Sequence, residues 1–421
     1  MRDEIKKRIE QINNGIVPEG YKNISGGIVP CDYEEKIYGD LFKFYGGLGI
    51  PRNELSDTGI PYLHYGDMHI NTFTKINYSQ YAEMPKYDGN VKGDETFLLD
   101  DGDVVFLDAS EDLNGTSRCV VIDNPKNRLF ISGLHTFVAK SKNDDLVKDF
   151  KQYISMPRYI QKQFETLAVG FKVYGLNRNT VRKIVIAYPP NKDEQQHIAD
   201  ILMKLGEAVS LQEKLVEKLD EQKKAFMQRL LGPKENWKKV KIGSLVVEKT
   251  ERNKIACENV MSISNKLGFI NQEEQFTKQV ASEDKSNYKL VLKDYIAYNP
   301  SRINVGSIAI YKNDDIGIVS PMYIVFECKI ISPKLLLLLL STNKGKYDIG
   351  NFLSGSVRDS LNFGDLCEIK IKLPPTDNQK EIIKIFDKFE QNIDLNRQKL
   401  EKLKQQQKSL MQLLLTGIVR V

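Results

Sequence analysis

The sequence predicts an α+β fold in which two mixed α/β globular regions are joined by two long helices, and three observations predict it. In residues 202–230 and 386–414, apolar side chains recur at alternating three- and four-residue steps, which places one stripe of a helix against a partner helix. The second stretch repeats the first, 184 residues later. Short apolar runs separated by turn residues fill much of the remaining chain, as in compact mixed sheets.

The repeat extends to the residues that interrupt the apolar stripe. Gln212 corresponds to Asn396, and Lys223 corresponds to Gln407. Two unrelated amphipathic helices would not share these interruptions, and a period of about 185 residues is far longer than the units of roughly 20–50 residues that build solenoids. The repeat therefore indicates a duplicated domain with its helix. The predicted seam residues are Leu202, Leu205, Val209, Gln212, Val216, Leu219, Phe226 and Leu230 in the first helix, and Phe386, Phe389, Ile393, Asn396, Leu400, Leu403, Leu410 and Leu414 in the second.

Proline pairs set the boundaries of these regions. Pro189-Pro190 and Pro374-Pro375 end the strands before the helices, and Asp193 and Asn378 are the expected N-caps. Gly232-Pro233 stops the first helix. We expect a first globular region at 1–188 with an N-terminal helix at 2–12, a helical region at 189–232, a second globular region at 233–373 and a second helical region at 374–421.

Composition limits the protein class. The net charge of +5 is compatible with a nucleic-acid partner without requiring one. Five scattered cysteines and four scattered histidines give neither a disulfide framework nor a zinc spacing, so we expect reduced thiols, no metal and a cytoplasmic location. The start of the chain does not resemble a signal peptide, and the longest apolar run, Leu335–Leu340, is too short to cross a membrane.

Catalytic motifs are absent from the sequence. There is no P-loop, no G-x-S-x-G and no H-E-x-x-H. Tyr188-Pro189-Pro190-Asn191 contains the residue types of an amino-methyltransferase motif in the wrong order, and no glycine-rich cofactor loop accompanies it. Glu217 and Asp220 fall at solvent positions of the first helix. We therefore predict no catalytic residue and no cofactor bound by this chain.

Polar and basic residues gather on the loops between predicted strands. A DNA-binding surface needs cations for phosphates and forked donors or amides for base edges, although each such residue could also be a solvated loop residue. The candidates are Ser110, Asn114, Ser117, Arg118 and Lys172 in the first region, and Asn299, Ser301, Arg302, Asn304 and Arg358 in the second.

Taken together, these features resemble the specificity (S) subunit of type I restriction–modification systems, over nearly the whole chain. The resemblance rests on several segments that are weak singly and specific in this order. They are Pro189-Pro190 with Gln195 and Ile198, Pro374-Pro375 with Gln379 and Ile382, the repeated Glu-Lys-Leu at 217–219 and 401–403, and the segments 59–67, 317–321 and 355–361. The resemblance implies two target recognition domains joined by two long antiparallel coiled-coil helices.

The resemblance also implies a function and partners. Each domain would read one half of a bipartite double-stranded DNA target, and the chain would assemble with two modification (adenine methyltransferase) subunits and with restriction/translocase subunits, as in phage defence. S-adenosylmethionine, ATP and Mg would act on those partners. One alternative is the specificity subunit of a methyltransferase-only or non-translocating (type IIB-like) system, and another is a structural coiled-coil adaptor without a DNA role. No base-contacting residue carries over, because the recognition domains differ among family members.

Helix length suggests how the spacer of a bipartite target would be set. A helix over residues 193–231 would be about 58 Å long at ~1.5 Å per residue. Domains held by such helices could reach major-groove segments one DNA turn apart, about 34–36 Å. Leu211 and Leu395 fall outside the seam and are expected to be available to partner subunits. The N-terminal helix is expected to pack near the end of the second long helix.

Overall fold

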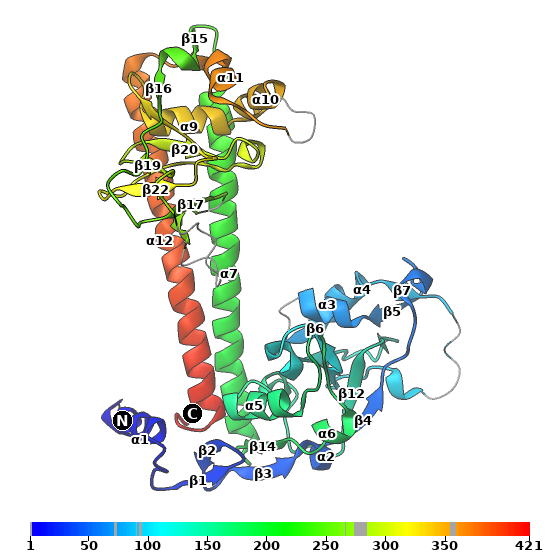
Figure 1. The fold of residues 1–421 in the computed structure, drawn as a ribbon. Helices are drawn as coiled ribbons and strands as arrows, with labels where there is room; N and C mark the ends of the chain where they lie inside the picture. The colour runs from blue at the N-terminus through cyan, green and yellow to red at the C-terminus, as the bar shows by residue number, and fades with distance from the viewer. Residues whose placement is uncertain are drawn as a thin grey trace. The chain divides into compact units, whose positions relative to one another are not determined.

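The computed structural model describes residues 2–70, 74–89, 91, 95–265, 267–272, 284–353 and 359–421, which divide into two compact units. The first unit comprises Met1–Gln212 with Lys399–Val421, and the second comprises Glu213–Gln398. Each unit contains a globular head and part of each long helix (Figure 1). We call residues 14–190 the first head and residues 232–374 the second head. In the described part of the chain, every sheet lies wholly within one head.

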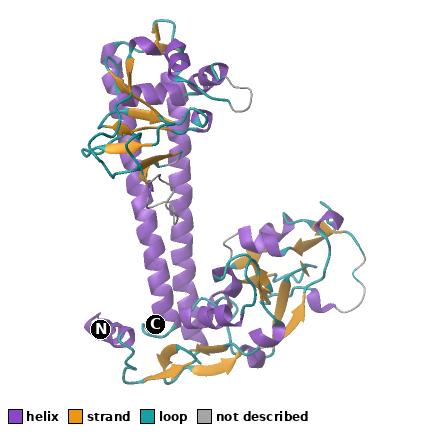
Figure 2. Ribbon diagram, viewed as in Figure 1, coloured by secondary structure: helices purple, strands orange, loops and turns teal. Residues whose placement is uncertain are grey.

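The two long helices form where the apolar spacing predicts them. Helix α7 spans Lys192–Leu231 and helix α12 spans Thr376–Leu415, each with 40 residues. Figure 2 shows both as continuous helices. All the predicted seam residues are buried or half-buried, as expected for side chains between two helices. Leu211 and Leu395, which the spacing excludes from the seam, are 67% and 65% exposed.

Within each unit the helix segments pack antiparallel, and the polar interruptions of the stripe have different partners in the two units. In the second unit, Lys223 donates to Glu390 across the helix pair at 2.8 Å. The corresponding positions in the first unit are Gln407 and Gly206, which lie next to each other without an ion pair. The repeat therefore conserves the position of the interruption while changing its chemistry.

The first head is built around a five-stranded sheet of order β4-β12-β8-β10-β6, in which β6 runs parallel to β10. Its central strand is buried on both faces, because Val104 and Phe106 belong to one hydrophobic core while Val105 and Leu107 belong to another. The strands are β1 Tyr21–Ile24, β2 Gly27–Pro30, β3 Glu34–Ile37, β4 Phe42–Gly46, β5 Ile60–Leu63, β6 Lys75–Asn77, β7 Lys86–Tyr87, β8 Val104–Leu107, β9 Ala109–Ser110, β10 Cys119–Asp123, β11 Ile131–Ser132, β12 Thr136–Ser141, β13 Tyr174–Gly175 and β14 Val185–Tyr188. The helices before α7 are α1 Arg2–Asn13, α2 Tyr38–Leu41, α3 Tyr65–Ile70, α4 Tyr78–Ala82, α5 Arg158–Leu167 and α6 Arg178–Val181, with 3-10 turns η1 Arg52–Glu54, η2 Glu95–Phe97, η3 Asn114–Ser117 and η4 Phe150–Tyr153.

The second head repeats this arrangement with a four-stranded sheet of order β16-β23-β20-β21, which corresponds to β4-β12-β8-β10. Its central strand is again buried on both faces, with Ile296 and Tyr298 in one core and Ala297 in another. The strands are β15 Lys238–Lys241, β16 Val246–Lys249, β17 Met261–Ser264, β18 Gly268–Asn271, β19 Lys289–Val291, β20 Ile296–Tyr298, β21 Ile308–Ile310, β22 Gly317–Val319, β23 Ile324–Cys328 and β24 Lys370–Leu373. The helices are α9 Pro333–Ser341, α10 Asn343–Asn351 and α11 Phe363–Glu368, with 3-10 turns η5 Ile242–Ser244 and η6 Ile303–Val305.

A glutamine connects the start of each long helix to the turn before it, and it is buried in the first copy and half-buried in the second. Gln195 Nε2 donates to the carbonyl of Pro189, and Gln379 Nε2 donates to the carbonyl of Pro374, both at 2.9 Å. The carbonyls of Pro189 and Pro374 lie in the turn between strand and helix, where the side-chain amide supplies their hydrogen-bond donor. The N-cap prediction at Asp193 was wrong, because Asp193 lies in the first turn and its N–H donates to Asn191 Oδ1 at 2.8 Å. The second N-cap prediction was also wrong, since Asn378 lies inside α12, which begins at Thr376.

The N-terminal segment packs against the last residues of the chain within the first unit. Arg8 Nη1 donates to the carbonyl of Ile418 at 2.6 Å, and the hydroxyl of Tyr21 donates to the carbonyl of Gly417 at 2.8 Å. Arg420 donates to Glu194 on α7 at 2.7 Å. These contacts bring both chain termini to the same end of the α7–α12 pair in this unit. Within the described ranges, no helix is both long and apolar enough to cross a membrane.

Candidate nucleic-acid interface

Corresponding loops carry the predicted DNA-binding residues in the two heads. In the first head, β4 and β8 end and β12 begins on the same side of the sheet, at one end of its strands. This follows from the pairing of Gly46 with Phe137 and of Leu107 with Thr136. We call this side the loop edge of the first head. In the second head, β20 ends where β23 begins, and the loop 299–306 follows β20 as 108–117 follows β8. The strand order of the repeat therefore brings the candidates that follow β8 and those that follow β20 to equivalent edges.

The four candidates after β8 differ in what their side chains can do. Ser110 is almost fully buried, and its hydroxyl donates to the carbonyl of Asp112 at 2.7 Å. Ser117 is buried as well, and half-buried Arg118 donates to the carbonyl of Met68 at 2.8 Å. Of the four, Asn114 has an exposed side chain. Ser110, Ser117 and Arg118 thus shape this loop, while Asn114 lies at its surface.

The loop after β20 has a similar division of roles. Asn299 is buried, and its Oδ1 accepts a hydrogen bond from the N–H of Ser301 at 3.0 Å. Ser301, Arg302 and Asn304 are exposed around this brace. Arg358 lies outside the described residues. The exposed side chains of Ser301, Arg302 and Asn304 supply a hydroxyl, a guanidinium and an amide, which are the groups that contact phosphates and base edges.

Lys172 belongs to a short hairpin that joins the loop edge of the first head. The N–H groups and carbonyls of Val169 and Gly175 bond to each other at 3.0 and 2.8 Å. Next to this bridge, β13 pairs with β9, with Tyr174 opposite Ser110. The structure therefore brings the hairpin beside the loop that follows β8. Lys172 itself is exposed.

The cleft that lies next to this hairpin was not predicted from the sequence. The cleft has a volume of about 410 Å³, and its lining residues are Phe44, Phe137, Leu176, Asn177, Arg178, Asn179 and Arg182. Two guanidiniums beside two amides provide the donors that recognise guanine, adenine and phosphate. A charge pattern could have revealed the site, because residues 166–192 contain five Lys or Arg and no Asp or Glu.

A histidine and a carboxylate lie next to each other at the loop edge of the first head. His135 Nδ1 lies 3.1 Å from Asp108 Oδ1, and the ring of Tyr65 meets the ring of His135 edge-on at 5.3 Å between centroids. Burial raises the pKa of Asp108, while the neighbouring His135 opposes that shift. His135 adopts a left-handed φ of 61° in the turn before β12, which directs the chain into the strand. These side chains extend the polar surface at the loop edge.

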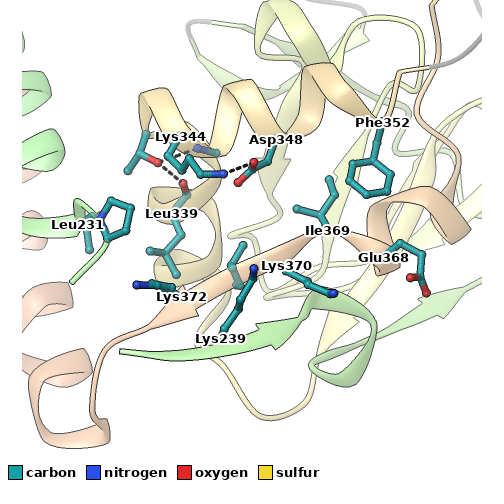
Figure 3. Close-up of a pocket in the computed structure, with 14 residues that line it drawn as sticks. Leu231, Lys239, Leu339, Lys344, Asp348, Phe352, Glu368, Ile369, Lys370 and Lys372 are labelled. Atoms are coloured by element: carbon teal, nitrogen blue, oxygen red, sulfur yellow. Dashed lines mark hydrogen bonds and ion pairs between the residues drawn. The ribbon is translucent and has the colours of Figure 1, made fainter. Parts of the chain in front are cut away.

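In the second head, the basic residues gather on the paired strands β15 and β24. A pocket of about 400 Å³ has Lys239, Lys370 and Lys372 on these strands and Lys344 on α10 (Figure 3). Lys344 pairs with Asp348, whereas no carboxylate among the described residues pairs with Lys239 or Lys370. The remaining lining residues are Leu231, Pro233, Leu339, Thr342, Gly345, Phe352, Glu368, Ile369 and Ile371. Within the described residues, Lys239 and Lys370 therefore present unpaired positive charge above an apolar floor, while the lining carboxylates Asp348 and Glu368 pair with Lys344 and Lys241.

Equivalent glutamines on the long helices hold the heads in place. In the first unit, Gln412 of α12 accepts from the N–H of Arg158 at 2.8 Å and donates to the carbonyl of Met156 at 2.9 Å. In the second unit, Gln228 of α7 accepts from the N–H of Asn343 at 2.9 Å. Both glutamines hold the start of a corresponding helix, α5 or α10. These contacts attach each head to the segments of α7 and α12 that belong to its own unit.

An ionic cluster strengthens this attachment in the second unit. Glu390 accepts hydrogen bonds from Lys223 of α7 and Lys334 of α9, both at 2.8 Å, and Lys334 also pairs with Asp387. Burial alone would raise the pKa of Glu390, but the two lysines outweigh it and lower the pKa below its usual value. The cluster therefore depends on the ionised carboxylate.

Comparison with known proteins assigns the family. The model of the "Type I restriction modification DNA specificity domain" matches residues 30–221 and 234–405. The chain belongs to this family. Each match takes in most of one head and most of the long helix that follows it, so the family model describes the same segment that the sequence repeats.

Named relatives and solved structures agree with this assignment. The chain is 25% identical to the type I restriction enzyme MjaVIII specificity subunit of Methanocaldococcus jannaschii, over 96% of both chains. It is also 25% identical to the putative MjaX specificity subunit of that organism, over 96% of this chain and 97% of the relative. The fold is similar to that of the type I S subunit from M. genitalium, with a TM-score of 0.51 and 16% identity over 91% of this chain and 96% of that one. It is also similar to a chain from a structure of type I R-M assembly and conformational transition, with a TM-score of 0.54 and 13% identity over 93% of this chain and 99% of that one. The chain is thus a DNA-specificity protein of the type I restriction–modification class, and this family supplies recognition.

Proposed function

We propose that this specificity chain reads a bipartite double-stranded DNA sequence, with one half-site bound by each head, and that other subunits carry out the reactions. The observation that carries the proposal is the repeat of one scaffold with two different loop chemistries. Equivalent strands β8 and β20 lead into loops that expose different polar side chains. A duplicated reader with identical loops would favour a symmetric target, whereas different loops favour two unrelated half-sites.

The long helices would set the distance between the half-sites. A continuous helix of 40 residues is about 60 Å long at ~1.5 Å per residue. Each of the two helices contributes residues to both units, so a change in helix length would move one head along the DNA relative to the other. On this proposal, the spacer depends on the helices and the half-site sequences depend on the heads.

The partners in this proposal are two modification subunits and the restriction/translocase subunits. Leu211 and Leu395 are exposed apolar residues at matched positions of α7 and α12, which supports two equivalent docking positions for modification subunits. S-adenosylmethionine would be bound by the modification subunits, and ATP and Mg would be bound by the restriction/translocase subunits. This chain would contribute recognition and positioning of the DNA.

Exchange of one head tests the proposal. Residues 237–373 are replaced by the corresponding segment of a relative with a different target, and the methylated motif is determined by sequencing the methylome of the host. We expect one half of the motif to change and the other half to persist. A motif in which both halves change together would contradict independent reading, and loss of all methylation in an assembled complex would contradict the proposed modularity.

A further inference from the structure

The hairpin at residues 169–175 of the first head presents an unusually exposed aromatic side chain. Phe171 is 100% exposed, and its apolar neighbours Val169 and Val173 are 79% and 54% exposed. Single apolar residues are common on protein surfaces, but three alternating ones along one short hairpin, from its base at Val169 to its tip, form a projecting apolar edge. Such an edge is typical of a segment that inserts into a partner.

The conformation of the hairpin is defined by its backbone. The bridge between Val169 and Gly175 closes its base, and pairing of β13 with β9 attaches it to the sheet domain. Gly170 has a φ of +141°, and a Cβ atom at this position would lie 1.9 Å from the carbonyl oxygen of Val173. Glycine is therefore required here. Phe171 is held out from the domain by a specific turn, which lowers the entropic cost of inserting it into a partner.

The charge around the hairpin identifies the chemistry of that partner. From the hairpin to the end of the cleft, residues 166–182 carry three basic residues and no acidic ones, whereas the corresponding segment 351–367 carries one basic and two acidic residues. Lys172 adjoins Phe171, and the cleft with Arg178 and Arg182 lies on the same segment. The paired strand β9 is flanked by Asp108, Glu111 and Asp112, so the positive charge lies on the hairpin itself and on the cleft beyond it. An apolar tip next to these cations fits duplex DNA, whose phosphates bind the cations and whose base stack accepts the apolar side chain.

We propose that Phe171 acts as a wedge that enters the base stack at one step of the half-site bound by the first head. This inference rests on the proposed DNA-reading function. The phenyl ring would partly unstack that step and bend the duplex, while Lys172 would neutralise an adjacent phosphate. The cost of unstacking depends on the base step, so the wedge contributes to specificity at a position without base-edge hydrogen bonds.

Fluorescence of 2-aminopurine tests the wedge directly. The full chain is assembled with its modification subunits and bound to duplexes that carry the methylated motif, with 2-aminopurine placed at each position of both half-sites in turn. We expect fluorescence to rise at one step in the wild-type complex, because the probe brightens when it unstacks. Phe171→Ala should return that signal to the level of free duplex and weaken binding by about tenfold.

Two further variants separate the wedge from a general structural effect. Gly170→Ala keeps the phenyl ring but cannot keep the turn, so it should lose the same signal. Leu129→Ala alters an exposed apolar residue on the loop 124–130, which contacts the segment before β8 at the opposite edge of the sheet, and should change nothing. Phe171→p-benzoylphenylalanine should photocrosslink to DNA, and the same group at Leu129 should not.

The outcomes distinguish this inference from the function on which it rests. An unchanged signal in Phe171→Ala would overturn the wedge, as would crosslinking of position 171 to a modification subunit instead of DNA. Loss of subunit assembly in Phe171→Ala would likewise assign the hairpin to a protein partner. A wild-type complex with no preference for the motif would instead overturn the proposed function itself.

Discussion

The two heads of this specificity chain share a scaffold and differ in where they carry charge. Both place the same strand order around a central strand that is buried on both faces. In the first head, exposed Lys172 lies on the hairpin, and Arg178 and Arg182 line the cleft next to it. In the second head, uncompensated lysines lie on β15 and β24, whereas the equivalent strand β3 carries Glu34 and Glu35. Burial constrains the scaffold, while exposed positions are free to diverge toward different DNA sequences.

The largest effect is expected from the helix seam, where each unit can be destabilised separately. Phe386 is fully buried against Phe226, and Leu202 is its equivalent in the first unit. Phe386→Ala should destabilise the second unit by about 3–5 kcal/mol. The only tryptophan, Trp237, is buried in the second head, so its fluorescence during urea unfolding reports that loss. Leu202→Ala should leave the Trp237 transition in place, and an equal shift in both variants would show that the units unfold as one.

Removal of the arginines in the first-head cleft should affect DNA binding at one half-site. Arg178→Ala and Arg182→Ala should each cost about 1–3 kcal/mol of binding free energy and relax the preference for bases in that half. Equilibrium titration with duplexes mutated in either half measures both effects. The matched control is Lys126→Ala, which removes an exposed cation from the loop at the opposite edge. Equal loss of preference in both halves would contradict assignment of the cleft to one half-site.

The lysines of the second head should behave differently, because a strand surface without exposed amides suits phosphates better than bases. Lys239→Ala and Lys370→Ala should weaken binding to all sequences alike. Each should reduce the slope of log K against log salt concentration by about 1. Lys329→Ala, which removes an exposed lysine outside the pocket, serves as the control. An unchanged salt slope in the two pocket variants would show that this pocket does not face the DNA.

The smallest effect concerns pH and distinguishes the two units. The pKa of Glu390 is lowered in the folded protein, so its contribution to stability is complete above its ordinary pKa and is lost as the pH falls through the lowered value. Acidification toward pH 4 should therefore weaken the second unit, and Glu390→Gln should remove about 1 kcal/mol at neutral pH and flatten this dependence. Thermal melts followed by Trp237 fluorescence at pH 4 to 7 measure it. Gly206 occupies the equivalent position in the first unit, so Gly206→Gln is the matched control and should leave the dependence intact.

The two long helices α7 and α12 were predictable from the sequence, because their buried side chains recur at regular three- and four-residue steps. A stripe of apolar residues requires a partner surface, and the shared interruptions at Gln212 and Asn396 identified the duplication. The roles of Gln195 and Gln379 were not predictable from that pattern, because their hydrogen bonds depend on a turn made by prolines. The sequence therefore specified which faces are buried more clearly than it specified which polar groups are paired.

The candidate DNA site was less accessible to sequence reasoning. Ser110 and Asn299 were selected because their polar side chains follow strands, yet in the structure both brace their loops. A polar residue in a loop can bond to its own backbone as readily as to a ligand, and composition does not distinguish these two uses. Arg178 and Arg182 were not predicted, because they begin and cap a short helix that precedes the last strand of the head. Their significance comes from the cleft, which forms only when the sheet edge is assembled.

The central claim is that the helices fix the spacer while the heads fix the half-sites. Its most direct test inserts one four-residue helical turn after Lys214 in α7 and after Gln398 in α12, matched positions at which the antiparallel segments can lengthen together. The methylated motif of the host is then sequenced. The account predicts two unchanged half-site sequences separated by a longer spacer. Methylation with the original spacer would contradict it.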